Sequence, residues 1–356
     1  MARLTLALSA VLIAFTVAGL QSQRPPAGTS HQGKAYRFNK VADGVYHAVG
    51  TGALAVVGNS SVIVNDDDVI VVDDHVSPAA AWVLLQELKD ITSKPVRTVI
   101  NTHFHFDHAH GNQIFDKDVA IIGHEFTREM LTGGKSVEMP LFKNYLAGIP
   151  RQIEDLKKRI AAEPDRAKKS ELEKQLHVAE NNSVSQAELK PTPPNVTLQT
   201  RMTLHRRFAG TDREIQIRFL GRAHTAGDVV VYLPKEKIVC TGDMLTAGLS
   251  NMSDAFVNEW PGTLDELKKL DFAADLPGHG VPFSNKSLIT AYQAYLTDLI
   301  NQVTKLKNEG VSPDDAAKRV DLTAHAKDFP QITGLGAEIR GVRRMYAWLD
   351  EQGAAR

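Results

Sequence analysis

The sequence His-Phe-His-Phe-Asp-His at residues 103–108 places three imidazoles and one carboxylate within six residues. It directly follows residues 96–102, an apolar run that is typical of a buried strand. Imidazole nitrogen and carboxylate oxygen are ligands that zinc accepts, and a catalytic zinc takes three protein ligands and keeps a fourth position for water. The motif therefore requires a fold that brings distant ligands to the end of this strand.

The motif is suited to two metal ions. At a strand end, residues two apart can point the same way, so His103 and His105 can serve one ion and Asp107 and His108 another. Six residues cannot close two such sites, and the missing ligands must come from later in the chain. Three later segments each supply one candidate in a turn or at the end of a strand-like run: His224 in AHTAGD, Asp243 in TGD and His279 in PGHG.

These motifs, in this order between residues 41 and 283, resemble those of the metallo-β-lactamase superfamily. The resemblance implies an α/β protein with the αββα sandwich of the metallo-β-lactamase type. It also implies two Zn²⁺ ions as cofactors, with iron or manganese as the alternative metals. In this sequence the first ion would be bound by His103, His105 and His224, the second by Asp107, His108 and His279, and both by a bridging Asp243.

The residue at position 243 separates this chain from one large group of true metallo-β-lactamases, in which a cysteine binds the second zinc. Asp243 stands at the corresponding position, so the ligand set is closer to that of glyoxalase II and the general hydrolases. The only cysteine, Cys240, lies three residues earlier in an apolar run, and we expect it to be a core residue.

The implied activity is hydrolysis of a small molecule. Two ions about 3.5–4 Å apart can share a water, lower its pKa and stabilise the oxyanion that forms on attack at a carbonyl. The nucleophile would be metal-bound hydroxide, and Asp107 would be the catalytic residue that orients it and passes a proton to the leaving group. The candidate bonds are ester, thioester, lactone, lactam and amide, with β-lactams among the substrates considered.

Metal-bound imidazoles generally donate their other ring N–H to a carboxylate or carbonyl. The nearest carboxylates in the sequence are Asp73 and Asp74, which follow an apolar run, residues 69–72. We therefore expect one of these two aspartates to orient a ligand histidine.

Two other functions stay open. One is an iron-dependent oxygenase or oxidoreductase on the same fold, although flavodiiron proteins usually carry a Glu where His105 stands. The other is a non-catalytic, metal-binding periplasmic protein. Nucleic acid is not an expected partner, because 41 Lys and Arg residues face 42 Asp and Glu residues and leave a formal net charge of −1.

The first residues predict export. Residues 1–3 carry a positive charge and precede an apolar run, residues 4–20, as in a secretory signal peptide at residues 1–22. An uncleaved anchor is the alternative, but the run is short for a bilayer span of about 20 residues. Residues 23–36 would then be a flexible leader. The mature chain is expected to be periplasmic or secreted, without stable membrane association.

The rest of the chain is expected to form a hydrolase domain at residues 37–285 and a C-terminal helical segment at residues 286–356. Four β-type runs precede a helix that begins with Ser77 as its cap and Pro78 at its first position. These runs are residues 46–49, 54–57, 62–64 and 69–72.

A helical insertion is expected at residues 137–190, with two amphipathic helices split at Pro164. It is a lid over the metal site, a dimerisation arm or a surface excursion, and a homodimer through the helical segments is a further expectation. Residues 244–260, which follow Asp243, are the first candidate for substrate contacts.

Overall fold

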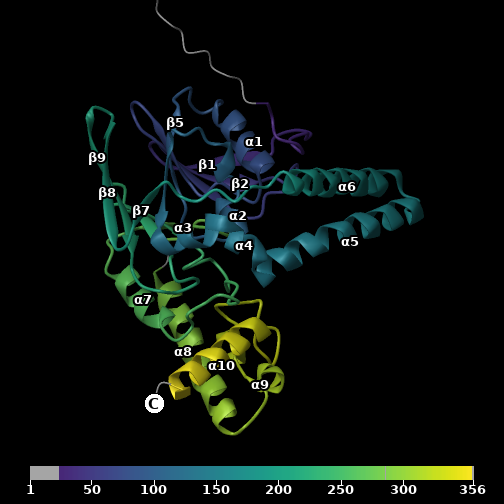
Figure 1. Cartoon of the computed structure of the whole chain (residues 1–356), viewed down its shortest axis with the longest axis vertical. Coiled ribbons are helices and arrows are strands. Elements are labelled where there is room, and N and C mark those ends of the chain that lie inside the picture. Colours follow the sequence, from purple (N-terminus) through teal and green to yellow (C-terminus); the bar gives the residue numbers. More distant parts are fainter. Residues whose placement is uncertain (1–23, 285, 355–356) are drawn as a thin grey trace, which may run out of the picture.

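The computed structural model describes residues 24–284 and 286–354, so the predicted signal peptide lies outside the described residues. Figure 1 shows the β-sheets in the upper part of the molecule and helices from the C-terminal part of the chain at its lower end. Among the described residues, none of the helices combines the length and the apolar composition that a bilayer span requires.

The first sheet has seven strands that neighbour one another in the order of the sequence. The first three pairs of neighbouring strands are antiparallel, and the last three pairs are parallel. Three of the predicted runs lie in β2, β3 and β4. The strands are β1 Tyr36–Ala42, β2 Val45–Gly50, β3 Ser60–Val64, β4 Val69–Val72, β5 Val96–Ile100, β6 Ala120–His124 and β7 Val196–Leu198.

The prediction of a strand at residues 54–57 is wrong, because this segment is a loop. Its apolar character has another cause: Leu54 is buried and Val56 half-buried in the hydrophobic cluster under the first helix. The loop is bonded to the opposite sheet, since Asn59 N donates to Gly278 O at 2.7 Å.

The second sheet has five strands in the spatial order β12, β11, β10, β9, β8. Only β11 and β12 are parallel. Both sheets contribute to one buried cluster, with Ile70 and Ile100 from the first and Ile217 and Val231 from the second, so they pack face to face. The strands are β8 Arg201–Phe208, β9 Thr211–Phe219, β10 Val229–Leu233, β11 Ile238–Gly242 and β12 Ala274–Pro277.

Helix α1 (Pro78–Leu88) covers the outer face of the first sheet, and it begins at the predicted Ser77 cap. The strand β4 shows how the layers are built, because its side chains alternate between two clusters. Val69 and Val71 pack with α1, whereas Ile70 and Val72 face the second sheet.

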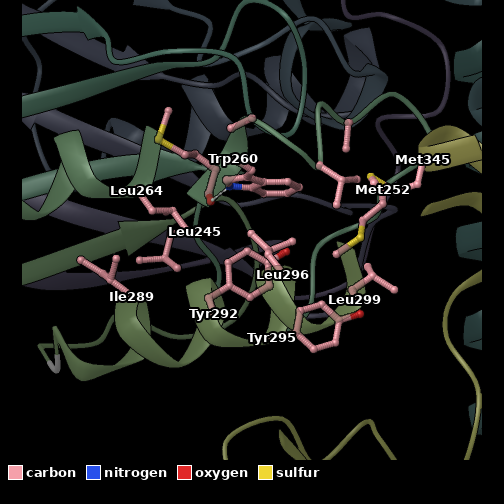
Figure 2. Close-up of a cluster of buried hydrophobic side chains, with 14 of the residues drawn as sticks. Leu245, Met252, Trp260, Leu264, Ile289, Tyr292, Tyr295, Leu296, Leu299 and Met345 are labelled. Atoms are coloured by element: carbon pink, nitrogen blue, oxygen red, sulfur yellow. Dashed lines mark hydrogen bonds between the residues drawn. The ribbon is translucent and has the colours of Figure 1, made fainter. Parts of the chain in front are cut away.

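Helices α7 (Trp260–Lys268) and α8 (Ser287–Asn308) cover the outer face of the second sheet. Trp260 and Leu264 of α7 lie beside Leu296 of α8 in one cluster, which also includes side chains of β10 and β11 (Figure 2). Two sheets between two helical layers form the αββα sandwich that the resemblance implied.

The helical insertion ends in a long hairpin that projects from the body of the molecule (Figure 1). The predicted split at Pro164 is confirmed, and Asp165 caps the second helix by accepting a hydrogen bond from Lys168 N. The first helix continues through Pro150, which is exposed. The helices between β6 and β7 are α3 Glu125–Leu131, α4 Lys135–Glu138, α5 Pro140–Ala162 and α6 Arg166–Ala187.

The base of this hairpin is fixed to the domain. Tyr145 of α5 stacks on Phe106 at 4.6 Å between ring centroids, and its hydroxyl accepts a hydrogen bond from Asn182 Nδ2 of α6 at 2.7 Å. Further out, the two helices pack mainly on each other through a small cluster that includes Leu156 and Leu172. Whether the hairpin is a lid or a dimerisation arm stays a prediction.

The C-terminal helices α9 (Pro313–Arg319) and α10 (Ile339–Ala354) pack on α8 and join the cluster on the second sheet. The boundary at residue 286 stays a prediction, but residues on both sides of it share this cluster. The buried C-terminal members are Ala316, Ala317, Val320, Leu322, Phe329, Val342, Met345 and Tyr346.

We expect Leu296→Ala to lower the free energy of unfolding of the whole chain by about 2–5 kcal/mol, because Leu296 is fully buried where α8 meets the sheet. Urea unfolding followed by circular dichroism would measure it. The control is Val184→Ala at a 48% exposed position, with an expected change within about 0.5 kcal/mol. A separate early transition of the C-terminal helices alone would contradict the shared cluster.

Candidate metal centre

The predicted motif lies where β5 ends. His103 and His105 are in the loop after the strand, and Asp107 and His108 are in the short helix α2 (Phe106–Ala109). The ring centroids of His103 and His108 are 4.3 Å apart, and those of His103 and His105 are 4.7 Å apart. All four side chains are buried, so the sequence motif folds into one compact cluster.

The distant candidates reach the same place from the second sheet. Asp243 follows β11 and His279 follows β12, and because these two strands are parallel, their carboxyl ends meet at one edge. His224 lies in the loop before β10. Gly242 has a φ of 55°, and a Cβ there would lie 2.4 Å from Thr102 Oγ1, so the close approach of the two loops requires glycine.

The structure brings all seven predicted ligands together. They form three overlapping groups, and in each group the candidate ligand atoms lie within 4.8 Å of one another. Two of the groups are the triplets that the resemblance implied for the two ions, and the remaining group places Asp243 beside members of both. The groups are His103, His105 and His224; Asp107, His108 and His279; and His103, His108 and Asp243.

The Asp243 carboxylate lies between the two triplets. Its Oδ2 is 3.6 Å from His224 Nε2, a member of the first triplet. The same oxygen is 3.4 Å from His279 Nε2, and Oδ1 is 3.5 Å from His108 Nε2, both in the second triplet. This is the position that a bridging ligand requires.

Unpaired buried atoms test whether these residues fit metal ions. Among the described residues, His103 Nε2 and Asp243 Oδ1 are buried without a hydrogen-bond partner. An unpaired buried polar group costs about 1–3 kcal/mol. His105 Nδ1 and His224 Nε2, 2.9 Å apart, converge on the same place. Nitrogen and carboxylate atoms that converge and lack partners fit a pair of divalent metal ions.

The two triplets differ in charge. Burial lowers the pKa of His103 well below its usual range, and burial lowers the pKa of His224 to about 3, so both imidazoles are neutral at pH 7. Neutral imidazole is the form that binds metal. Although burial alone would lower it, the carboxylates of Asp243 and Asp107 raise the pKa of His279 to about 10. A metal ion that binds His279 therefore displaces a proton.

The structure distinguishes between the two aspartates at the end of β4. Asp73 Oδ2 lies 3.0 Å from His108 Nδ1, and the Asp73 carboxylate accepts hydrogen bonds from Thr102 N and Oγ1 at 2.7 and 2.8 Å. Asp74 instead accepts a hydrogen bond from Gly111 N at 3.0 Å. Asp73 is therefore the carboxylate that orients His108.

A second orienting carboxylate was not recognised in the sequence. Asp254 lies in the loop after Asp243, and its Oδ2 is 3.0 Å from His105 Nε2. This leaves His105 Nδ1 free to face His224. The loop as a whole was a candidate because it follows a ligand, but no spacing singles out Asp254 within it.

A pocket of about 300 Å³ opens at the cluster. His105, Asp107, His224, Asp243 and His279 all line it, so both triplets are accessible from one side. The other walls combine apolar side chains with hydroxyl and amide groups. They are Phe106, Leu141 of α5, Thr246, Leu249, Ser250 and Asn251.

We expect Asp254→Asn to weaken metal binding by about 10- to 100-fold, because His105 loses the carboxylate that orients its ring. Competition with a chromophoric chelator measures the dissociation constant. The matched control is Asp271→Asn, whose exposed carboxylate pairs with Lys237 at the surface. Equal metal affinity in both variants would show that the Asp254 contact does not support the metal centre.

Comparisons with known proteins point to one family. A family model described as the metallo-beta-lactamase superfamily matches residues 54–289. A linear primary-alkylsulfatase of Pseudomonas sp. (strain ATCC 19151) is 23% identical over 289 residues, which are 74% of this chain and 50% of that protein. A metallo-beta-lactamase type 2 of Bacteroides fragilis is 34% identical over 97 residues, 26% of this chain and 39% of that protein. The chain therefore matches half or less of the length of these relatives.

Solved structures share the fold. A metallo-beta-lactamase from Pontibacter korlensis has a TM-score of 0.51 and 18% sequence identity, and the match covers 74% of this chain and 99% of that one. The family model spans more than half of the chain, and it includes all seven residues of the cluster. The chain belongs to the metallo-β-lactamase superfamily, and it is hydrolase-like with a His/Asp cluster capable of binding metal.

Proposed function

We propose that the chain is an exported, zinc-dependent hydrolase that cleaves an ester, thioester, lactone, lactam or amide bond of a small molecule. One observation carries the proposal: two triplets of metal-binding side chains, with a carboxylate between them, line a single pocket. A purely structural metal site is closed by its protein ligands, whereas a catalytic one stays accessible.

His103, His105 and His224 would hold one ion, Asp107, His108 and His279 the other, and Asp243 would contact both. Two metal ions held in this way would lower the pKa of a shared water and stabilise the oxyanion that forms during attack on a carbonyl.

The residues of the chain supply position and proton transfer. The Asp107 carboxylate lines the pocket, and its Oδ2 lies 3.1 Å from His279 Nε2. From this place it can orient the attacking water and pass a proton to the leaving group. Ser250 and Asn251 on the wall offer hydrogen bonds to substrate, and Phe106 and Leu249 exclude water.

Sulfate esters are a second candidate substrate class. The alkylsulfatase relative matches 74% of this chain, whereas the lactamase of Bacteroides fragilis matches 26%. The longer match supports including sulfate esters beside β-lactams and carboxylic esters when activity is measured.

The full chain, purified with its metals, is expected to contain about two zinc ions and to hydrolyse at least one of these bond types. Mass spectrometry of the metals and a panel of lactams, lactones, thioesters, esters and sulfate esters test this. A chelator should abolish the activity, and zinc should restore it. Iron in place of zinc would favour an oxygenase, and two metals without any hydrolysis would favour a non-catalytic protein.

Asp107→Asn is expected to lower kcat/KM by at least about 100-fold, because an amide cannot accept a proton from the attacking water. Rates are compared at equal metal content, which is measured on the same samples. Asp271→Asn serves again as a surface control. Full activity of Asp107→Asn at wild-type metal content would remove Asp107 from the mechanism.

Export is a proposal that rests on the first residues alone. When the full chain is expressed in a bacterial host with a periplasm, we expect processing near residue 22 and recovery of the mature chain outside the cytoplasm. Cell fractionation and mass determination of the N-terminus measure this. A chain that stays in the cytoplasm with residues 1–22 attached would contradict export.

A further inference from the structure

A second and larger cavity, of about 630 Å³, lies beside the metal pocket. Leu249, Ser250 and Asn251 line both. These three consecutive residues span at most about 7 Å from the first Cα to the last. The two cavities are therefore neighbours along this short segment.

The shared residues are held in place by hydrogen bonds. Ser250 Oγ donates to Asp243 O at 2.9 Å, and Ser250 N donates to the Tyr292 hydroxyl at 3.4 Å. Asn251 Oδ1 accepts from Ser253 N at 2.8 Å, while its Nδ2 has no acceptor among the described residues. Asn251 Nδ2 is therefore a free donor on a residue that lines both cavities.

The far wall of the second cavity is residues 331–338, the segment before α10. This segment is fixed by Gly336 N, which donates to Val320 O at 2.7 Å, and by Ala337 N, which donates to Ala317 O at 2.8 Å. It also lies against the shared loop, because a Cβ on Gly248 would be 2.1 Å from Gln331 Nε2. The C-terminal segment is thus a built wall of this cavity.

The lining of the second cavity combines apolar and polar side chains and carries no unpaired charge among the described residues. The Glu338 carboxylate accepts hydrogen bonds from Arg340 Nε at 2.5 Å and from Gly341 N at 3.1 Å. Leu335 is 70% exposed. The apolar residues are Leu249, Met252, Tyr295, Leu322, Ile332, Leu335 and Ala337.

We propose that this cavity binds an unbranched alkyl chain of the substrate. The substrate class is then an amphipathic ester, thioester or sulfate ester, with its polar reacting group at the metal centre and its apolar chain against residues 331–338. The identity of the reacting group rests on the proposed function, whereas the binding of the chain does not.

Straight-chain alkane sulfonates with 4, 8 and 10 carbons test the cavity without hydrolysis. Calorimetric titration of the metal-loaded full chain measures their affinity. We expect affinity to rise about two- to threefold per added methylene, below the roughly fourfold of full burial, because the cavity is partly open.

Two variants test whether the alkyl chain of the ligand lies in this cavity. Gly334→Phe adds a large side chain to the lining without backbone strain, since Gly334 has no left-handed φ and a Cβ there meets nothing within 4 Å. Leu335→Asp adds a charge at an exposed position. Both should reduce the affinity for the decyl sulfonate at least tenfold and leave the butyl sulfonate within about twofold. Val184→Asp, at an exposed position of α6, is the matched control for Leu335→Asp.

Three results would overturn the proposal. They are absence of binding, an affinity that does not rise with chain length, and an affinity that rises with chain length equally in the wild type and in both cavity variants. Hydrolysis of alkyl esters and sulfates of the same lengths is measured separately. Chain-dependent binding without hydrolysis would remove the proposed function and keep the cavity. Hydrolysis at a rate that does not depend on chain length would keep the proposed function and remove the role of the cavity.

Discussion

The structure depends on one edge at which the carboxyl ends of β5, β11 and β12 meet. Seven ionisable side chains gather there, and six of them are buried. Burying a charge costs several kcal/mol unless a partner compensates it. Here each carboxylate faces an imidazole: Asp107 lies beside His279, and Asp243 lies between His224 and His279. Glycine is required around them, because a Cβ on Gly278 would lie 2.4 Å from Asp243 Oδ1.

The sequence predicted which side chains gather at this edge, because they lie in local motifs at strand ends. A short motif such as residues 103–108 fixes which side chains leave one turn together, and parallel pairing of β11 with β12 brings Asp243 and His279 to the same edge. The orienting carboxylates have no such local signal. Asp73 and Asp74 are adjacent, and only the folded structure distinguishes Asp73, which contacts His108, from Asp74, which contacts Gly111.

The fold class was predictable from the resemblance of the motifs to a known family, and the helix split at Pro164 followed from helical periodicity and from proline. The run at residues 54–57 shows where such reasoning fails. A short apolar run fits a strand, but it fits equally a loop that buries one or two side chains, as Leu54 does. The role of the C-terminal helices was not predictable either, because an amphipathic helix does not specify the surface that it covers.

The loop at residues 244–260 links the C-terminal segment to the His/Asp cluster. At one end Ser250 is bonded to Asp243 O, and further along Asp254 contacts His105. At the other end Trp260 Nε1 donates to Met244 O at 2.9 Å. Helix α10 holds the same loop from outside, since Arg344 Nε donates to Ala255 O at 3.1 Å. A loop bonded on one side to metal ligands and on the other to α10 cannot move without disturbing both. The C-terminal helices therefore support the metal centre as well as the wall of the cavity beside it.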